Sequence, residues 1–227
     1  MNSFDSHVST HYDSKFSFPP LTWLPWVGLQ YASQPDGKRL LIVGESHYYD
    51  EKEFPGSKKA VMNPIETRWI AKKMGMDSET NGTRFFQSVN AVLDGLGPIT
   101  KKALWEKSAF YNFIQRPMNT NKERPSDDDY KVALSAFRHI LYVLKPDACL
   151  FFGVEAAKKM YHLPDAKPLN LLRFKSKVDN AYPWEGHLTL PVKKVNLLFI
   201  KHGSSYFSPL LWKPFISKWL ENSTKDN

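Results

Sequence analysis

Short, continuous apolar runs recur along the chain, and each ends at a glycine or a polar residue. Such runs are typical of strands in a parallel sheet, because helices bury both faces of that sheet. Two weaker runs of the same kind lie at Leu171–Phe174 and His187–Leu190. The strong strand candidates are Arg39–Val43, Phe110–Ile114, Asp147–Phe152 and Val195–Ile200.

Helical patterns lie between these strands. Asn63-Pro64-Ile65-Glu66 combines a capping side chain, a proline at the first helical position and a glutamate three residues after the cap, so a helix is expected from there to Gly75. The acidic run 127–129 after Ser126 suits a helix start better than a metal site, because carboxylates face the positive end of the helix dipole. The other predicted helices are Thr83–Leu93, the segment from Ser126 to Leu144 before Pro146, Val154–Tyr161, and a tail helix over 210–220 that breaks or begins at Pro214.

Strands that alternate with helices predict an α/β protein, specifically a three-layer α/β/α sandwich with a central, mostly parallel sheet. A chain of 227 residues is ample for one domain and marginal for two. Residues 1–20 are rich in Ser and His and lack periodicity, which predicts a flexible N-terminal arm. Residues 21–227 are then expected to form a single domain.

Composition narrows the classes of function. Lys and Arg total 31 against 23 Asp and Glu, a net charge of +8, which favours a polyanionic partner. The only cysteine, Cys149, excludes an intrachain disulfide framework and every multi-cysteine metal site. His7 and His11 lack a third ligand nearby in the sequence, so no metal is expected there. No other cofactor is expected either. The sequence has neither an apolar stretch of membrane length nor a signal peptide pattern, so we expect a protein of the cytoplasm or nucleoid that is neither secreted nor bound to a membrane. We also expect a monomer.

Three polar clusters follow predicted strands, where ligands bind in an open parallel sheet. They are the segment 44–49, Asn112 with Gln115 and Arg116, and the segment that begins at His202. A carboxylate, a carboxamide and an imidazole brought together can direct a water molecule, recognise a planar amide-like group and stabilise a developing oxyanion. Spacing alone does not name the reaction.

The order of these motifs resembles the uracil-DNA glycosylase superfamily. The segment Gly44–Asp50 looks like the first water-activating motif, and Phe110–Asn112 is similar to the strand that ends in the base-reading asparagine. Pro146–Gly153 is similar to the next apolar strand of the family, and His202–Ser205 resembles its His-Pro-Ser-Pro motif. The resemblance implies a uracil-DNA glycosylase-like fold. It also implies a monofunctional DNA glycosylase that flips uracil or another modified pyrimidine out of single- or double-stranded DNA and hydrolyses its N-glycosidic bond with an activated water.

The resemblance also implies roles for individual residues. Ser46 stands where the best known branch has its catalytic aspartate, and a serine cannot supply that negative charge. Another branch has a glutamate at the position of Glu45, so Glu45 is expected to activate the water, with His202 donating to the base oxygen and Asn112 reading the base edge. The expected base-binding residues are Asn112, Tyr48, Tyr49, Ser46 and His47, and the expected DNA-binding residues are Ser204, Ser205, Tyr206, Phe207, Lys201 and Arg116.

Two other interpretations remain open at this point. Without the aspartate, the chain can be a catalytically inactive member of the same fold that still binds nucleic acid. Alternatively, Glu45 and His47 belong to the site of an unrelated small-molecule hydrolase. Each candidate also has a purely structural explanation: aromatic residues near strand ends commonly pack at a rim, and a histidine at such a place is often a capping residue.

Overall fold

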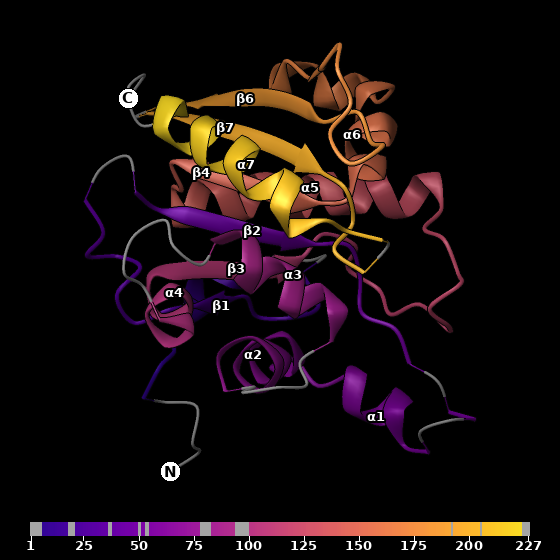
Figure 1. Cartoon of the computed structure of the whole chain (residues 1–227). Coiled ribbons are helices and arrows are strands. Elements are labelled where there is room, and N and C mark those ends of the chain that lie inside the picture. Colours follow the sequence, from indigo (N-terminus) through magenta and orange to yellow (C-terminus); the bar gives the residue numbers. More distant parts are fainter. Residues whose placement is uncertain are drawn as a thin grey trace.

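A single seven-stranded sheet runs through the protein in the order β1-β3-β2-β4-β7-β6-β5 (Figure 1). The computed structural model describes residues 6–17, 21–35, 38–49, 51–52, 55–77, 83–93, 100–191, 193–204 and 206–223. Each of the six predicted strands has a counterpart, but β3 runs two residues earlier than predicted, β5 is shorter and β6 is longer. The two-residue strand β1 is too short to give a sequence pattern. The strands are β1 (Trp26–Val27), β2 (Leu40–Gly44), β3 (Ser108–Asn112), β4 (Ala148–Phe152), β5 (Leu172–Arg173), β6 (Trp184–Leu190) and β7 (Lys193–Ile200).

The sheet has the expected parallel centre and antiparallel edges, so as a whole it is mixed. Strands β3, β2, β4 and β7 are parallel to one another and form the centre. Strand β1 at one edge and strands β6 and β5 at the other pair antiparallel. The physical reason is clearest at β6 and β7: β6 ends at Leu190 and β7 begins at Lys193, and so short a connection permits only antiparallel pairing.

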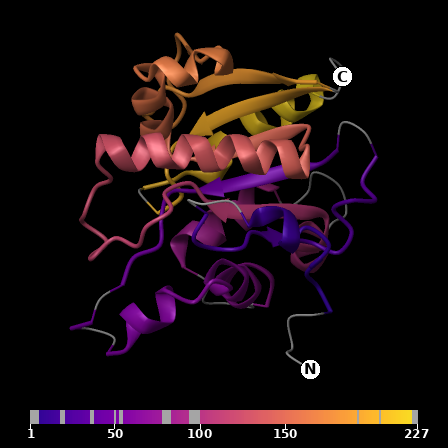
Figure 2. The ribbon, with the colours of Figure 1, turned by 180° about the vertical axis from the view of Figure 1, so that it is seen from behind.

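Helices cover both faces of the sheet, so the three-layer arrangement is found. One apolar cluster packs α5 (Asp127–Leu144) and α6 (Val154–Tyr161) against residues such as Leu41 and Val43 (Figure 2). A second cluster, on the face with Leu40 and Ile42, holds α3, α4 and α7. The elements on that face are α2 (Glu66–Ile70), the π-helix η2 (Ala71–Met76), α3 (Arg84–Leu93), α4 (Lys101–Lys107) and α7 (Pro209–Ser223); the remaining short elements are η1 (Asp13–Phe16), α1 (Ser57–Val61) and η3 (Pro164–Leu169).

Helix α5 confirms the interpretation of the acidic run as a cap. The Ser126 hydroxyl accepts from the Asp129 amide, and the Asp129 carboxylate accepts from the Ser126 amide, which together form a capping box. Helix α7 corrects the prediction for Pro214, because the helix begins at Pro209 and continues unbroken through Pro214. The buried side chains of Trp212 and Ile216 anchor this helix on the sheet and offset the one backbone hydrogen bond that a proline cannot make.

The N-terminal segment is packed rather than a flexible arm, at least over 6–17. Val8 pairs with Gly28 through a β-bridge, and the Phe16 side chain lies in the core between α5 and the sheet. The carboxylate of Asp13 receives two hydrogen bonds from the buried Arg68 guanidinium. Isolated apolar residues in a polar stretch carry no periodicity, so the sequence pattern missed this docking. Residues 1–5 and 18–20 lie outside the described residues. Within the described part of the chain, no helix combines the length and apolar character needed to cross a membrane.

Candidate functional site

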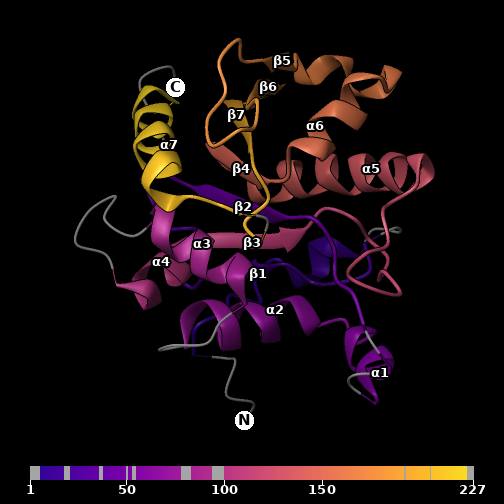
Figure 3. The ribbon, with the colours of Figure 1, turned by 45° about the vertical axis from the view of Figure 1, so that its right-hand side comes forward.

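The carboxyl ends of β2, β3, β4 and β7 lie at one edge of the sheet, which comes forward in Figure 3. The connection that follows β2 leads to the helices on the α3 face. The connections that follow its neighbours β3 and β4 lead to α5 and α6 on the opposite face. Loops that leave adjacent parallel strands toward opposite faces open a crevice beyond the strand ends. Glu45 follows β2 directly and therefore lies where this topology predicts the crevice.

The structure brings Glu45 and His202 together at that edge. Oε2 of Glu45 lies 3.9 Å from Nε2 of His202, and the two side chains are 30% and 29% exposed. Glu45 follows β2, and His202 follows β7 by one intervening residue. An acid and an imidazole from strands far apart in the sequence therefore share one partly open position.

Hydrogen bonding fixes the tautomer of the His202 ring. Nδ1 of His202 accepts from the Ser204 amide at 3.3 Å and lies 2.8 Å from the Ser204 hydroxyl. Because Nδ1 is an acceptor, the proton of a neutral imidazole is carried by Nε2, the nitrogen that faces Glu45. Burial lowers the pKa of His202 below its ordinary value; Glu45 raises it in part, and the charge of Arg124 lowers it further. The ring at neutral pH is thus an uncharged N–H donor directed at the crevice.

Asn112 occupies the end of β3, directly opposite Gly44 of β2. Its side chain is buried, and its carboxamide has no hydrogen bond to any residue that the structure describes, although its backbone carbonyl accepts from Gln115 Nε2 at 2.8 Å. A methyl group on Gly44 would overlap Oδ1 of Asn112, so the glycine is what allows the carboxamide to lie across the end of β2. Because the residue keeps 8% of its surface exposed, the unpaired carboxamide is within reach of water or a ligand.

Phe85 forms an aromatic wall between these groups, and the sequence did not single it out. Its ring centroid lies 5.8 Å from that of His202, and its Cζ would be 3.3 Å from a Cβ on Gly44. The same ring contacts Phe110 and Phe152 of the sheet at 6.0 and 5.4 Å. The sequence signal that could have found it is the pair Phe85-Phe86. Adjacent helical residues point about 100° apart, so one of the two rings must lie away from the centre of the core.

His47 faces the core and not the crevice. Its Nε2 lies 2.8 Å from the Thr67 hydroxyl, and its ring packs 4.6 Å from that of Trp23. Burial lowers the pKa of His47 to about 3, so the ring is neutral in the folded protein. The structure therefore does not bring this predicted base-binding residue to Glu45.

The neighbours of His47 remain near the surface. Tyr48 pairs with Met118 in a parallel bridge and is 54% exposed, and the Tyr49 hydroxyl donates to Asn119. Ser46 lies half-buried beside Glu45. Tyr48 is consequently the residue of this group that presents an open aromatic ring.

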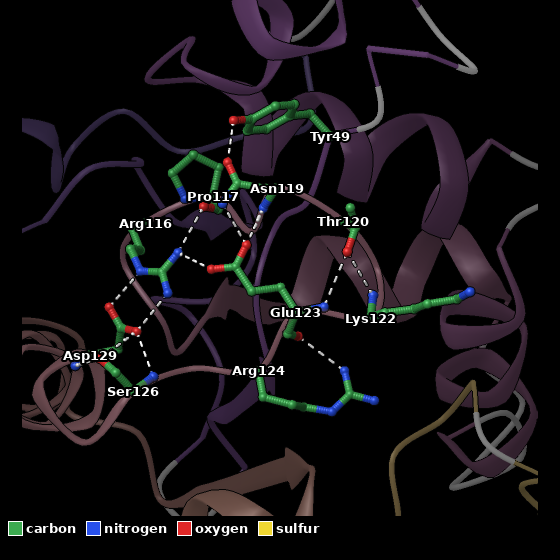
Figure 4. A network of polar contacts seen from close by, with 10 residues as sticks. All are labelled: Tyr49, Arg116, Pro117, Asn119, Thr120, Lys122, Glu123, Arg124, Ser126 and Asp129. Atoms are coloured by element: carbon green, nitrogen blue, oxygen red, sulfur yellow. Dashed lines mark hydrogen bonds and ion pairs between the residues drawn. The ribbon is translucent and has the colours of Figure 1, made fainter.

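Arg116 organises the loop between β3 and α5 (Figure 4). Its guanidinium donates to both Asp129 oxygens, at 2.7 and 2.9 Å, and to Glu123 at 2.7 Å. These acids raise the pKa of Arg116 even further above its usual range. The Arg116 charge is engaged within the protein, whereas Lys122 and Arg124 of the same loop are exposed.

The loop after β7 carries the remaining predicted DNA-binding residues. The Lys201 ammonium is engaged with Asp179, so it is not directed at the crevice. Tyr206 has a left-handed backbone with φ of 47° and is 96% exposed. Phe207 stacks on the buried Trp212 with nearly parallel rings 6.0 Å apart, as packing under the last helix requires. Ser204 is exposed, and Ser205 lies outside the described residues.

Other polar features lie away from this edge. A cavity of about 880 Å³ beside β6 and the end of α7 is lined by Glu185 and His187 among others, and by none of Glu45, Asn112 and His202. In the described ranges, no group of three or more His, Cys, Asp or Glu side chains is arranged to hold a metal ion, and His7 is paired with Glu106. No protein-family model matches this chain, and no curated protein matches its sequence.

Proposed function

We propose that this protein is a DNA glycosylase with a uracil-DNA glycosylase-like fold, which hydrolyses the N-glycosidic bond of a base flipped out of DNA. The observation that carries the proposal is the 3.9 Å approach of Glu45 to His202, with the unpaired carboxamide of Asn112 against Gly44, the residue that precedes Glu45. Acid, imidazole and amide are the three groups that the motif order implied, and they come from three different strands. The crevice at the strand ends gives a flipped base a place to enter.

Glu45 supplies the negative charge in this mechanism. Its carboxylate is partly exposed, so it can hold a water molecule against C1′ of the deoxyribose. As the bond between C1′ and the base nitrogen breaks, positive charge develops on the sugar and the carboxylate stabilises it. The water oxygen bonds to C1′, one of its protons passes to Glu45, and Glu45 returns a proton to the departed base anion by way of solvent. The products are an abasic deoxyribose and the free base.

His202 stabilises the departing base. Negative charge moves onto a pyrimidine as it leaves, and a neutral Nε2–H donor compensates that charge without needing to lose a proton. The bond from the Ser204 amide keeps the proton on the nitrogen that faces Glu45. The lowered pKa of His202 keeps the ring neutral at the pH of a cell.

Asn112 and two aromatic residues recognise the base. The Asn112 carboxamide presents one donor and one acceptor side by side, which matches a pyrimidine edge with an N–H and a carbonyl. Phe85, which lies between His202 and Gly44, is suited to stack on the ring, and Tyr48 is suited to cover the mouth. Lys122 and Arg124 are the exposed cations for flanking phosphates, and Tyr206 is the aromatic ring for the vacated stack.

The test is incubation with single- and double-stranded oligonucleotides that carry uracil, hypoxanthine, hydroxymethyluracil or glucosylated hydroxymethylcytosine, followed by alkaline cleavage at abasic sites. Strand breaks are expected with the wild-type protein and should disappear in Glu45→Gln and His202→Ala. Glu185→Gln and His187→Ala are matched controls, because this acid and this histidine line the cavity on β6.

Two outcomes would contradict the proposal. Salt-sensitive DNA binding without an abasic product on any substrate would indicate an inactive nucleic-acid-binding protein. Hydrolysis of small esters or nucleosides without DNA binding would indicate a small-molecule hydrolase instead.

A further inference from the structure

A tight turn between β5 and β6 places Asp179 next to the loop that carries His202. Val178 and Ala181 exchange both backbone hydrogen bonds, at 2.8 and 2.9 Å, and the two residues between them are Asp179 and Asn180. Both have left-handed backbones, with φ of 48° and 61°. Positive φ at both central positions is the type I′ geometry, which Asp and Asn tolerate better than most side chains. The turn therefore holds the Asp179 side chain in a fixed place.

The Asp179 carboxylate receives donors from three points of the following chain. Its Oδ2 accepts from the Ser208 amide at 2.9 Å, from Trp212 Nε1 at 3.2 Å and from Lys201 Nζ at 3.2 Å. The carboxylate is only 10% exposed, so these bonds replace most of its contact with water. Charged hydrogen bonds shielded in this way are among the stronger and more directional ones in proteins.

Lys201 also bonds to a later residue of its own loop. Besides Asp179, its Nζ donates to the carbonyl of Tyr206 at 2.8 Å. Both ends of the segment 201–208 are thus tied to Asp179, at Lys201 and at Ser208. Between these ends, the Ser88 hydroxyl donates to the Gly203 carbonyl at 2.7 Å and fixes the residue that follows His202.

We propose that Asp179 is a positioning residue: through Lys201 and Ser208 it holds the described residues on both sides of position 205, and with them the orientation of the His202 ring toward Glu45. The significance for catalysis rests on the proposed function, whereas the effect on the His202 ring does not. Loss of the Asp179 charge removes the ion pair with Lys201, which then keeps only its bonds to the backbone carbonyls of Asp179 and Tyr206. The Ser204 amide is then held less firmly under Nδ1 of His202.

A second buried acid and lysine supply a matched control. Asp147 pairs with Lys193 at the amino end of β7, the strand whose carboxyl end leads to Lys201. Asp147 also accepts from the Arg39 amide at 2.8 Å. Asp147 directly precedes β4, so Asp147→Asn removes an equivalent buried charge that pairs with a lysine of β7, without touching the 201–208 segment.

The experiment measures the tautomer of His202 in the full chain by nitrogen-15 NMR of labelled protein at pH 8, where a histidine of ordinary or lowered pKa is neutral. The wild-type ring should show the proton on Nε2, and Asp179→Asn should show a mixture of both tautomers, whereas Asp147→Asn should match wild type. His202→Gln identifies the signal. If Asp179→Asn does not fold, Lys201→Gln breaks the same link and leaves the bonds from Ser208 and Trp212 in place.

The proposal would be overturned if the His202 signals were unchanged in Asp179→Asn, or in Lys201→Gln if Asp179→Asn does not fold. It would also be overturned if Asp147→Asn changed the His202 signals as much as Asp179→Asn does. Where the wild-type protein makes abasic sites, Asp179→Asn should lower kcat by about tenfold or more while KM stays within about twofold, because a displaced catalytic group affects the chemical step more than substrate binding. If the wild-type protein makes no abasic sites, the proposed function fails while the NMR result still decides the role of Asp179.

Discussion

His47 should make the stability of the protein depend on pH. The ring lies between Trp23 and Thr67, where burial lowers its pKa to about 3. The pKa of a histidine in an unfolded chain is about 6.5. As the pH falls below that value, the unfolded chain gains a proton that the folded protein does not accept. The contribution of His47 is therefore fully present above pH 6.5 and is lost as the pH falls toward 3.

The magnitude follows from the difference between the two pKa values. Between pH 7 and pH 5, protonation of His47 in the unfolded chain should lower the free energy of unfolding by about 2 kcal/mol. The assay is urea unfolding at pH 7, 6 and 5 of wild type, of His47→Gln, which cannot titrate but can still bond to Thr67, and of His162→Gln. The last variant is the control, because it removes an exposed histidine at the end of α6.

The wild-type curve should fall by about 2 kcal/mol more than that of His47→Gln over this range, and His162→Gln should follow wild type. Parallel curves for wild type and His47→Gln would refute the reasoning. They would mean that the folded protein accepts the proton, as it would if His47 opened to solvent beside Glu45, where the motif resemblance had placed it.

Three further predictions concern the candidate site. Gly44→Ala should displace the Asn112 carboxamide by about 1 Å and lower kcat/KM for abasic-site formation by about 100-fold. Ile42→Val, in the same strand, is the control and should retain activity. An active Gly44→Ala would argue against Asn112 as the base-reading residue. Lys122→Gln and Arg124→Gln should each weaken DNA binding and reduce its salt dependence by about one phosphate contact, as titrations at several salt concentrations will show. Lys218→Gln, which changes an exposed lysine on α7, is the control. An unchanged slope of log binding constant against log salt concentration for both loop variants would exclude that loop from the interface. Activity should be constant from pH 8 down to the ordinary histidine value of 6.5 and fall only below it, because the pKa of His202 is lowered and its neutral form is required; a pH profile of kcat that falls already above 6.5 would contradict this.

The parts that sequence predicted well are those governed by local chemistry. Helix α6 begins and ends where its pattern indicated, because its apolar and capping positions lie within a few residues of one another. The same holds for the Ser126 cap of α5. Strand ends were also readable, and they sufficed to bring Glu45 and His202 to one edge before any distance was known.

The parts that sequence missed depend on contacts between distant segments. Phe85 is a wall of the site only because α3 docks against Gly203, more than a hundred residues later in the chain. Nothing near Asp179 in the sequence indicates that its carboxylate reaches Trp212. His47 adjoins Glu45 in the chain, and only the position of Thr67 determines that it faces inward.

The place of β2 between β3 and β4 has a consequence for biosynthesis. This strand leaves the ribosome before its parallel partners, which follow it only after many tens of residues, and β7 comes last of the four. Parallel pairing over such separations is slow, and an unpaired apolar strand is prone to aggregate. Glu45 can therefore meet His202 only after the residues up to position 202 have been translated. A chain that terminates before Lys193 carries half of a site and an unprotected strand.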